Sequence, residues 1–407
     1  MEQVINSLIE KNGTPFYLFD EQGFVDNYRV LEGTFQKVYP NYQICYSYKT
    51  NYTPFVCNLV KSLGGLAEVV SDMEYTLAKK LGYENSQIVY NGPSKGEGMY
   101  EHLLQGGILN IDSLDEAKRI VVFCGEHADK VFTVGIRINM EMGGDFISRF
   151  GLEPGSEDLR QTVALLKAQH NLKVIGLHCH ISRSRSVEAW AKRAKIMLKA
   201  ADEIIDGTPE YISLGSGMFA DMADYLKSQF GGDAVPTYED YSKACVEPIA
   251  YHYKGADRKP MLYTEPGTTV VARYLSFVSK VLSIKQIRGR WIANMDGDYH
   301  NLGEICTMKK LPTRVLHCGK PPKYYEKIDI MGFTCLEQDV MVPQWTGDLA
   351  EGDIIVFDNV GGYSIVSKPQ FIKPQSAMYA KRANGRVEMI MRAETFDDVF
   401  GKFSFEF

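Results

Sequence analysis

The chain lacks long apolar runs, an excess of basic residues and a signal peptide. Among its 407 residues, no apolar stretch approaches the roughly 20 residues that a membrane span needs. Lys and Arg number 45 against 51 Asp and Glu, a net charge of −6, which disfavours a nucleic-acid partner. The first residues, MEQVINSLIEKNGTP, lack the basic and apolar segments of a secretory signal. We therefore expect a cytoplasmic protein with no membrane and no nucleic-acid partner.

Paired cysteine motifs are also missing. The eight cysteines are scattered, and none forms a C-x-x-C pair, which is typical of reduced thiols in the cytoplasm. The stretch HCH at 178–180 places His178 and His180 on one face of a strand, but no third ligand stands near them in the sequence. We therefore expect no metal.

What the sequence does contain is an alternation of strands and helices. Helical stretches such as EDLRQTVALLKAQH and SVEAWAKRAKIMLKAADEII separate short β-rich runs, and their apolar residues recur every three or four positions. The β-rich runs are QICYSYK, LAEVV, QIVYNG, ILNID, VFTVGIRIN, VIGLHCHI, YISLG and MLYTEPG. This alternation predicts an α/β fold, a (β/α)8 TIM barrel over residues 26–275.

From residue 276 the pattern changes to short β-rich runs with Gly, Pro and Asp between them. This indicates an all-β domain over residues 276–407. The run TPFYLFD at 14–20 predicts a strand before the barrel begins. Because chain ends often lie close together, we expect the N-terminal segment 1–25 to complete the β domain.

Polar residues stand where the predicted barrel strands end, the edge at which barrel enzymes carry their chemistry. Alone, each has an ordinary explanation: a solvated lysine, a core histidine, a turn or a surface carboxylate. Together they are the parts of a pyridoxal phosphate site. In chain order they are Lys49, Glu68, Asn91, Asp112, Arg137, His180, the turn Gly215-Ser216-Gly217, and Glu265.

Seven motifs in order resemble one family. YSYKTN is similar to its Y-x-x-K-x-N, and EVVSDMEYTLAKKLG to its D-V-V-S-x-x-E segment. The others are RIN with SRFGL, GLHCHI, YTEPG, GFTCLEQD with VGGYS, and RAETFDDV. The chain resembles the fold-type III pyridoxal phosphate decarboxylases, the diaminopimelate and ornithine decarboxylase group, along nearly its whole length. The resemblance implies an alanine racemase-like barrel with a C-terminal β-sandwich or barrel domain.

The resemblance also implies roles for the strand-end residues. Lys49 would form the Schiff base with pyridoxal 5'-phosphate. Glu265 would sit against the pyridine nitrogen and keep it protonated, so that the ring accepts electrons from the departing carboxylate. His180 would stack on the ring. Glu68 would pair with Arg137.

Further roles follow for the turn and for the β domain. The N–H groups of Gly215, Ser216 and Gly217 would face the cofactor phosphate, together with the hydroxyl group of Tyr363. Cys335 would reach the site from a partner subunit and take part in protonating the product carbon. The resemblance therefore implies a homodimer.

The chain departs from the family pattern at several positions. Thr268 replaces the arginine of E-P-G-R, and Ser182 and Arg183 replace the glycine and serine of H-I-G-S. We keep Ser182 and Thr268 among the expected cofactor contacts. Arg183 or Arg185 is expected to hold either the cofactor phosphate or an acidic group of the substrate, because the guanidinium fork suits both.

The most informative departure follows Cys335. The family's acidic residue, which receives the distal amine of the substrate, is Leu336 here, and Glu337 comes one residue late. On a strand, one step turns a side chain to the other face, and an unpaired buried ammonium is costly. We keep Glu337 as a candidate substrate contact. The sequence thus favours a modified or carboxylate-bearing amino acid over ornithine or lysine, with diaminopimelate less favoured.

Two other functions are also compatible with the sequence. An amino-acid racemase or epimerase uses the same barrel and cofactor, but Glu265 favours decarboxylation, because racemases of this fold usually lack that carboxylate. A non-catalytic, decarboxylase-like regulatory protein is the second alternative. Such proteins typically lose the lysine or the cysteine, and this chain has both Lys49 and Cys335.

Overall fold

The computed structural model describes residues 1–143, 147–318 and 320–406. The chain divides into two compact units. The barrel unit comprises Tyr28–Phe219 and Val235–Thr269, and the sheet unit comprises Met1–Asn27, Ala220–Ala234 and Val270–Phe407. The domain limits expected from the sequence, 26–275 and 276–407, remain predictions.

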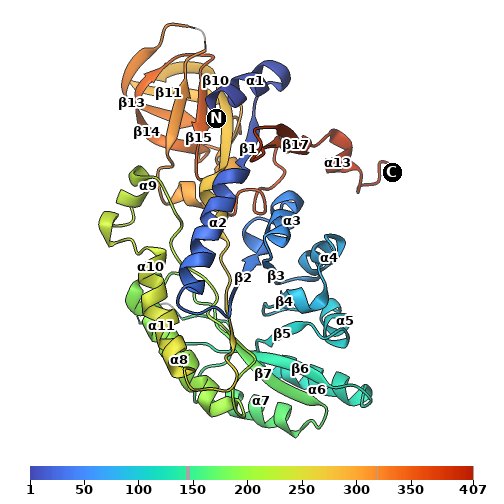
Figure 1. Ribbon diagram of the computed structural model, residues 1–407. Coiled ribbons are helices and arrows are strands. Elements are labelled where there is room, and N and C mark those ends of the chain that lie inside the picture. The colour runs from blue at the N-terminus through green and yellow to red at the C-terminus, as the bar shows by residue number, and fades with distance from the viewer. Residues whose placement is uncertain (144–146, 319, 407) are drawn as a thin grey trace. The chain divides into compact units, whose positions relative to one another are not determined.

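Eight strands close into a parallel barrel in chain order (Figure 1). Each of the β-rich runs predicted for this part of the chain forms one of them, so the predicted TIM barrel is confirmed. The strands are β2 (Tyr42–Ser47), β3 (Leu66–Val69), β4 (Ile88–Tyr90), β5 (Ile108–Ile111), β6 (Phe132–Arg137), β7 (Leu172–His178), β8 (Tyr211–Ser213) and β9 (Met261–Thr264).

Helices connect the barrel strands, and four of them begin at a serine cap. The hydroxyl groups of Ser71, Ser113, Ser156 and Ser186 each accept the N–H of the residue three positions later, which satisfies a donor that the helix leaves free. The capped helices are α4 (Asp72–Lys80), α6 (Leu114–Glu126), α7 (Glu157–Ala168) and α8 (Val187–Ile204). The others are α2 (Glu21–Gln36), which enters this unit, α3 (Pro54–Ser62), α5 (Gly98–Leu104), α10 (Tyr238–Tyr241) and α11 (Glu247–His252).

Side chains from several strands fill the barrel. Cys45, Leu66, Val89, Tyr211 and Tyr263 form one buried cluster. Tyr211 needs the space beside Gly135, because a Cβ atom there would lie 2.0 Å from the phenolic oxygen. This packing closes the barrel interior and leaves the C-terminal strand ends to carry polar side chains.

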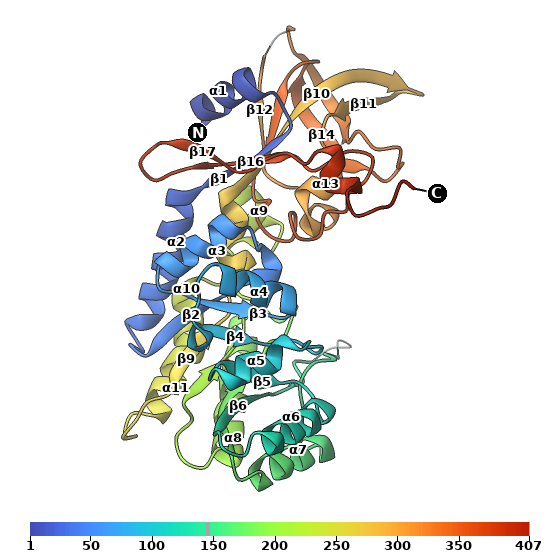
Figure 2. The ribbon, with the colours of Figure 1, turned by 90° about the vertical axis from the view of Figure 1, so that its right-hand side faces the viewer.

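The sheet unit is built on a nine-stranded sheet (Figure 2). Its main path runs β14-β13-β11-β10-β1-β16-β17, and β15 pairs with β10 and β12. The strands are β1 (Phe16–Asp20), β10 (Leu275–Ile287), β11 (Arg290–Met295), β12 (Thr313–Leu316), β13 (Lys323–Met331), β14 (Val340–Leu349), β15 (Ile354–Phe357), β16 (Ala377–Lys381) and β17 (Val387–Met391). The helices are α1 (Glu2–Asn12), α9 (Asp224–Ser228), α12 (Thr268–Val271), which begins in the barrel unit, and α13 (Phe396–Phe400).

The N-terminal strand lies inside this sheet. β1 pairs antiparallel with β10 and parallel with β16. Phe16 and Leu18 of β1 pack with Ile5 and Leu8 of α1 in one buried cluster. The first residues of the chain therefore help to bury the core of the sheet unit.

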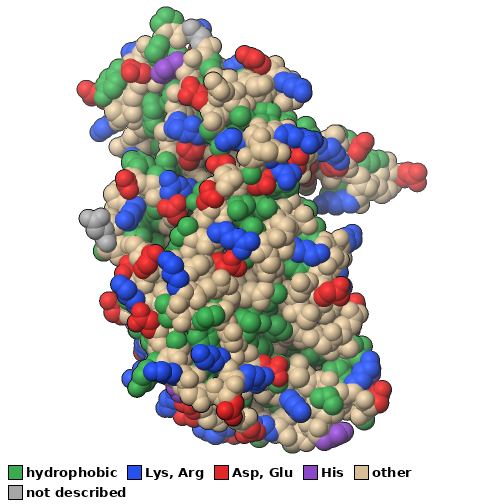
Figure 3. Space-filling model, viewed as in Figure 1, with side chains coloured by type: hydrophobic (Ala, Val, Ile, Leu, Met, Phe, Trp, Pro, Cys, Tyr) green, Lys and Arg blue, Asp and Glu red, His purple; other side chains and the backbone are tan. Residues whose placement is uncertain are grey.

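The surface carries mixed charge. Figure 3 shows Lys and Arg side chains interspersed with Asp and Glu over the face in view, in keeping with 45 basic and 51 acidic residues. Within the described parts of the chain, no helix combines the length and apolarity of a membrane span.

Candidate active site

Lys49 lies on a short 3-10 turn, Tyr48–Thr50, directly after β2. Its Nζ atom is 2.5 Å from Oε2 of Glu68, and its side chain is 31% exposed while that of Glu68 is 1% exposed. Ser47 Oγ donates to the same carboxylate oxygen at 2.6 Å. Lys49 thus presents an amine at the barrel mouth with its charge matched by a buried carboxylate.

The predicted pairing of Glu68 with Arg137 is wrong. Arg137 instead makes a 3.0 Å ion pair with Asp112. The order of strands explains this result, because β3 is the neighbour of β2 and β5 is the neighbour of β6. Each cation pairs with the carboxylate at the end of the adjacent strand.

Asn91 links the two carboxylates at the centre of the site. Its Nδ2 donates to Glu68 Oε1 and to Glu265 Oε1, each at 3.1 Å. Its Oδ1 accepts from Asn110 Nδ2 at 2.8 Å, and Tyr211 donates to Asn110 Oδ1 at 2.7 Å. The chain of donors therefore runs from the phenol toward the carboxylates, and it directs N–H groups at both Glu68 and Glu265.

Glu265 is buried and surrounded by donors. Besides Asn91, it accepts from Ser213 Oγ at 2.8 Å and lies 3.0 Å from His178 Nε2. Burial alone would raise the pKa of Glu265, but the adjacent His178, and then Lys49, bring its pKa below the ordinary range. Glu265 is thus a fixed anion at the end of β9.

His178 was not predicted as a site residue. The signal in the sequence is the alternation of HCH along a strand, which also suits a pair of metal ligands. Among the described residues no three His, Cys, Asp or Glu side chains gather as metal ligands. The ring of His178 serves instead to hold Glu265.

His180 lies just past β7 and contacts the glycine-rich turn. The N–H of Ser216 donates to His180 Nδ1 at 3.2 Å. Burial and the nearby Lys49 hold the pKa of His180 well below its ordinary value. The ring is therefore neutral, with Nδ1 as an acceptor, and its orientation is fixed by the turn that follows β8.

The turn itself fits closely against the end of β7. Gly215 has φ of 62°, and a Cβ atom there would lie 2.2 Å from the carbonyl oxygen of Cys179, so only glycine fits. Its N–H donates to Ser213 Oγ at 3.3 Å. Gly217, with φ of 107°, has an N–H group that meets no acceptor among the described residues. Of the three N–H groups predicted to face a phosphate, that of Gly217 is the one not already used within the protein.

The remaining predicted residues of the barrel unit lie around this turn and strand. Ser182 and Arg183 are exposed, and Arg183 has φ of 66°. Arg185 is half-buried, with its guanidinium 5.4 Å from the ring centre of Phe219. Thr268 is half-buried at the start of α12.

The sheet unit holds the other predicted residues. Cys335 and Glu337 are exposed in the turns between β13 and β14. The predicted strand alternation around Glu337 is wrong, since residues 332–339 do not form a strand. Asp339 holds the turn by accepting from the N–H and hydroxyl groups of Thr334 at 3.0 and 2.7 Å. Tyr363 is half-buried in a loop, with φ of 59°.

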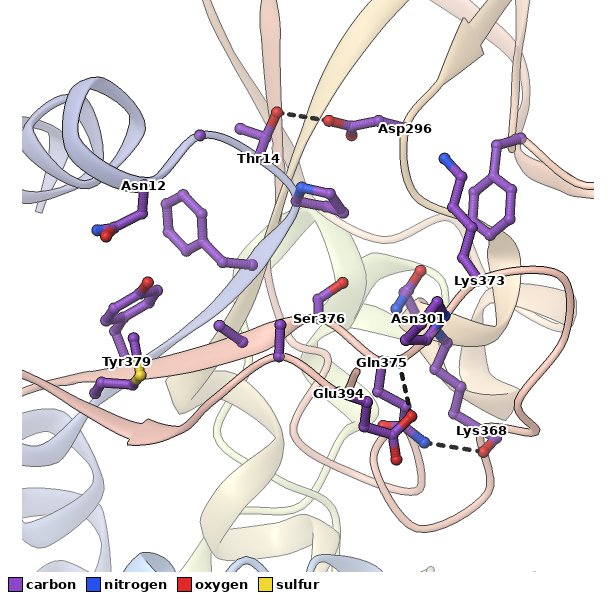
Figure 4. A pocket seen from close by; sticks show the side chains of 18 residues that line it. Asn12, Thr14, Asp296, Asn301, Lys368, Lys373, Gln375, Ser376, Tyr379 and Glu394 are labelled. Atoms are coloured by element: carbon purple, nitrogen blue, oxygen red, sulfur yellow. Dashed lines mark hydrogen bonds between the residues drawn. The ribbon is translucent and has the colours of Figure 1, made fainter. Parts of the chain in front are cut away.

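A cavity of about 470 Å³ is also found in the sheet unit (Figure 4). Thr14 and Asp296 on its wall are joined by a 2.5 Å hydrogen bond, and the ammonium of Lys373 lies 4.0 Å from the ring centre of Phe333. Cys335 and Tyr363 are not among the described residues that line it. None of the predicted site residues is among the described residues that line this cavity.

Comparisons with known proteins identify the family. Residues 30–272 match the family described as "Pyridoxal-dependent decarboxylase, pyridoxal binding domain". A diaminopimelate decarboxylase of Methanocaldococcus jannaschii is 26% identical over 426 residues, covering 97% of this chain and 92% of that protein. The L-glutamyl-(BtrI acyl-carrier protein) decarboxylase of Niallia circulans is 26% identical over 431 residues, covering 97% and 95%. A crystal structure of the M. jannaschii diaminopimelate decarboxylase has a TM-score of 0.85 at 24% identity, covering 98% of this chain and 94% of that chain.

The fold and the family match define a pyridoxal phosphate-dependent carboxy-lyase. More particularly, the chain belongs to the fold-type III pyridoxal-dependent decarboxylases, the diaminopimelate and ornithine decarboxylase group. It is an amino-acid decarboxylase, and its cofactor is pyridoxal 5'-phosphate.

The residues at the barrel mouth fit this cofactor. Lys49 supplies a primary amine, and Glu265 supplies a buried anion. The neutral ring of His180 is suited to stacking on an aromatic face. The N–H of Gly217 lacks an acceptor in the described chain, as expected where backbone donors receive a phosphate group.

Proposed function

We propose that this enzyme decarboxylates an α-amino acid whose distal part carries a carboxylate or an acyl group. The observation that carries the proposal is the placement of two arginines, Arg183 and Arg185, directly after β7, while Leu336 stands where a partner for a distal ammonium is expected. Ornithine and lysine would leave an ammonium without a carboxylate in that position, which costs several kcal/mol (about 3 to 5) when the charge is buried.

The relatives support two versions of this substrate. Several are named diaminopimelate decarboxylase, and the distal carbon of diaminopimelate bears a carboxylate as well as an amine. One is named for a glutamyl group on an acyl-carrier protein. An acidic or acylated amino acid, such as a glutamyl derivative, agrees with both arginines and with Leu336, so we favour it over diaminopimelate.

Each residue at the barrel mouth has a role in the reaction. When bound, the cofactor supplies the electron-accepting ring. Lys49 would hold the cofactor through its amine, and the carboxylate of Glu68, 2.5 Å from that amine, orients it. Glu265, ionised and held by His178, Ser213 and Asn91, keeps a proton at the ring nitrogen. His180 orients the ring from the side of the glycine-rich turn.

Within the same proposal, Cys335 acts from the partner subunit of a homodimer and donates the proton to the product carbon. Its exposure in a turn suits a thiol that serves a neighbouring chain, whereas a cysteine buried in apolar surroundings is usually inert. Mixing inactive Lys49→Ala and Cys335→Ala proteins tests this point. Recovery of about a quarter of wild-type activity is expected from random subunit exchange; no recovery in mixed dimers would contradict action in trans.

The substrate is tested by measuring carbon dioxide release from a panel of amino acids by the purified holoenzyme. The panel contains L-glutamate, γ-thioester glutamyl derivatives with a free α-amine, meso-diaminopimelate, L-lysine and L-ornithine. We expect turnover of an acidic or acylated member. Faster turnover of lysine or ornithine than of every acidic member would overturn the proposal.

The role of the arginines is tested separately. Arg183→Gln and Arg185→Gln should raise KM for the acidic substrate with a smaller change in kcat, because a lost ground-state contact acts mainly on binding. Arg160→Gln is the matched control, since Arg160 lies on α7 and pairs with Glu157 at the surface. Unchanged KM and cofactor content in both variants would exclude these arginines from the site.

A further inference from the structure

Helix α8 carries an arginine in its apolar stripe. Arg193 is fully buried, together with Trp190, Ala194 and Met197 on the same face of the helix. Its guanidinium lies 4.2 Å from the ring centre of Trp190. In the described chain no carboxylate lies within ion-pair distance of it. A buried charge without a counter-ion is costly, so its retention here calls for a specific role.

All the hydrogen bonds of Arg193 go to two loops at the barrel mouth. Its Nη1 donates to the carbonyl oxygens of Leu214 and Ser216 at 2.8 and 2.9 Å. Its Nη2 donates to those of Ile181 and Ser184 at 3.3 and 3.5 Å. Arg193 therefore joins the loop after β7 to the turn after β8.

The direction of these bonds determines what the turn presents on its other side. In a trans peptide unit the carbonyl and the following N–H point in opposite directions, so the N–H groups of Gly215 and Gly217 point away from Arg193. An accepted hydrogen bond polarises a peptide unit and strengthens its N–H as a donor. The N–H of Gly217, which has no acceptor among the described residues, is thus aimed away from a buried cation that polarises it.

We propose that Arg193 is a positioning residue that shapes and charges the phosphate-binding turn, and that the cofactor phosphate is the counter-ion of this buried guanidinium. The inference depends on the placement of the cofactor phosphate at Gly215–Gly217. It does not depend on which amino acid is decarboxylated. Arg193 acts from behind the turn and touches neither substrate nor reacting atoms.

Pyridoxal, which lacks the phosphate, separates this role from a general structural one. Apo-protein is titrated with pyridoxal phosphate and with pyridoxal, and attachment at Lys49 is verified by borohydride reduction and peptide mapping. In Arg193→Met the dissociation constant for pyridoxal phosphate should rise about 10- to 100-fold, the range expected for lost charge-assisted hydrogen bonds. The constant for pyridoxal should change less than about twofold. An equal weakening of both ligands, or no weakening of either, would overturn the proposal.

Two further variants keep the test decisive. Lys192→Met removes an adjacent positive charge from the exposed face of α8 and should change neither constant. Arg193→Lys keeps the charge but reaches fewer carbonyls, and should give an intermediate loss specific to pyridoxal phosphate; it replaces Arg193→Met if that protein does not fold. Inorganic phosphate should raise the melting temperature of wild-type apo-protein more than chloride at equal ionic strength does, and this difference should shrink in Arg193→Lys. If wild-type protein does not label at Lys49, the site assignment itself fails, which is a distinct outcome.

Discussion

Replacing Asn91 with aspartate tests the hydrogen-bonded centre of the active site. Asparagine and aspartate have nearly the same shape. The exchange, however, replaces the amide that donates to Glu68 and Glu265 with a carboxylate beside them. The amide nitrogen is 3.1 Å from both Glu68 and Glu265. Two unit charges about 3 Å apart repel by roughly 5 kcal/mol at an effective dielectric constant near 20, which is about four pKa units.

The ammonium of Lys49, which lies 2.5 Å from Glu68, offsets part of this repulsion. Because both carboxylates act on it, we expect the pKa of the new carboxyl group to lie well above the usual value of about 3.9, in the pH range of the assay. Below that pKa its proton can replace one of the lost donors, and above it three carboxylates stand together.

The assay is the pH profile of kcat/KM for carbon dioxide release from the substrate identified by the panel. The kcat/KM of Asn91→Asp, divided by that of wild type, should fall at least about tenfold between pH 6 and pH 8.5. A loss of roughly 1.4 kcal/mol in transition-state stabilisation suffices for that factor. Asn91→Leu, which removes the donors without adding charge, should give a low ratio with little pH dependence. Asn58→Asp adds the same charge on the exposed side of α3 and serves as the control. A profile of Asn91→Asp parallel to that of wild type would refute the assigned network.

Three predictions concern stability. Burial raises the pKa of Glu74 to about 7. Between about pH 4.5 and pH 7 the folded state therefore holds a proton that the unfolded state has lost. Above pH 7 the ionised group lowers the free energy of unfolding by about 3 kcal/mol. Glu74→Gln, which can still accept from Val70 N–H, should raise the melting temperature at pH 8 but not at pH 5; an equal gain at both would contradict this. Lys95→Met breaks a fully buried 2.7 Å ion pair with Glu116 and should lower the unfolding free energy by about 3 to 5 kcal/mol, with partial recovery in Lys95→Met/Glu116→Gln; melting curves that match wild type would count against it. Ile372 has φ of 67°, a strained value for a β-branched residue. Ile372→Asn should therefore raise the free energy of unfolding by about 1 kcal/mol, measured by thermal unfolding. A lower melting temperature would show that the strain is absent.

The sequence by itself determined the barrel and most of the chemistry. Strand and helix periodicity, with a serine before each of four helices, specified local structure that depends on near neighbours only. The residues that end the strands could also be read directly, because parallel strands place their C-terminal ends at one edge. The sequence predicts Lys49, His180 and Glu265 as site residues in this way.

The tertiary structure alone decided which of these residues contact one another. Chain order makes the strands of these residues neighbours, but only side-chain direction and packing paired Lys49 with Glu68 and Arg137 with Asp112. Packing also turned His178 toward Glu265 and placed Arg193 under the glycine-rich turn. Partners far apart in the chain are chosen by packing and by the need to compensate buried charge, and these are properties of the closed barrel rather than of any segment within it.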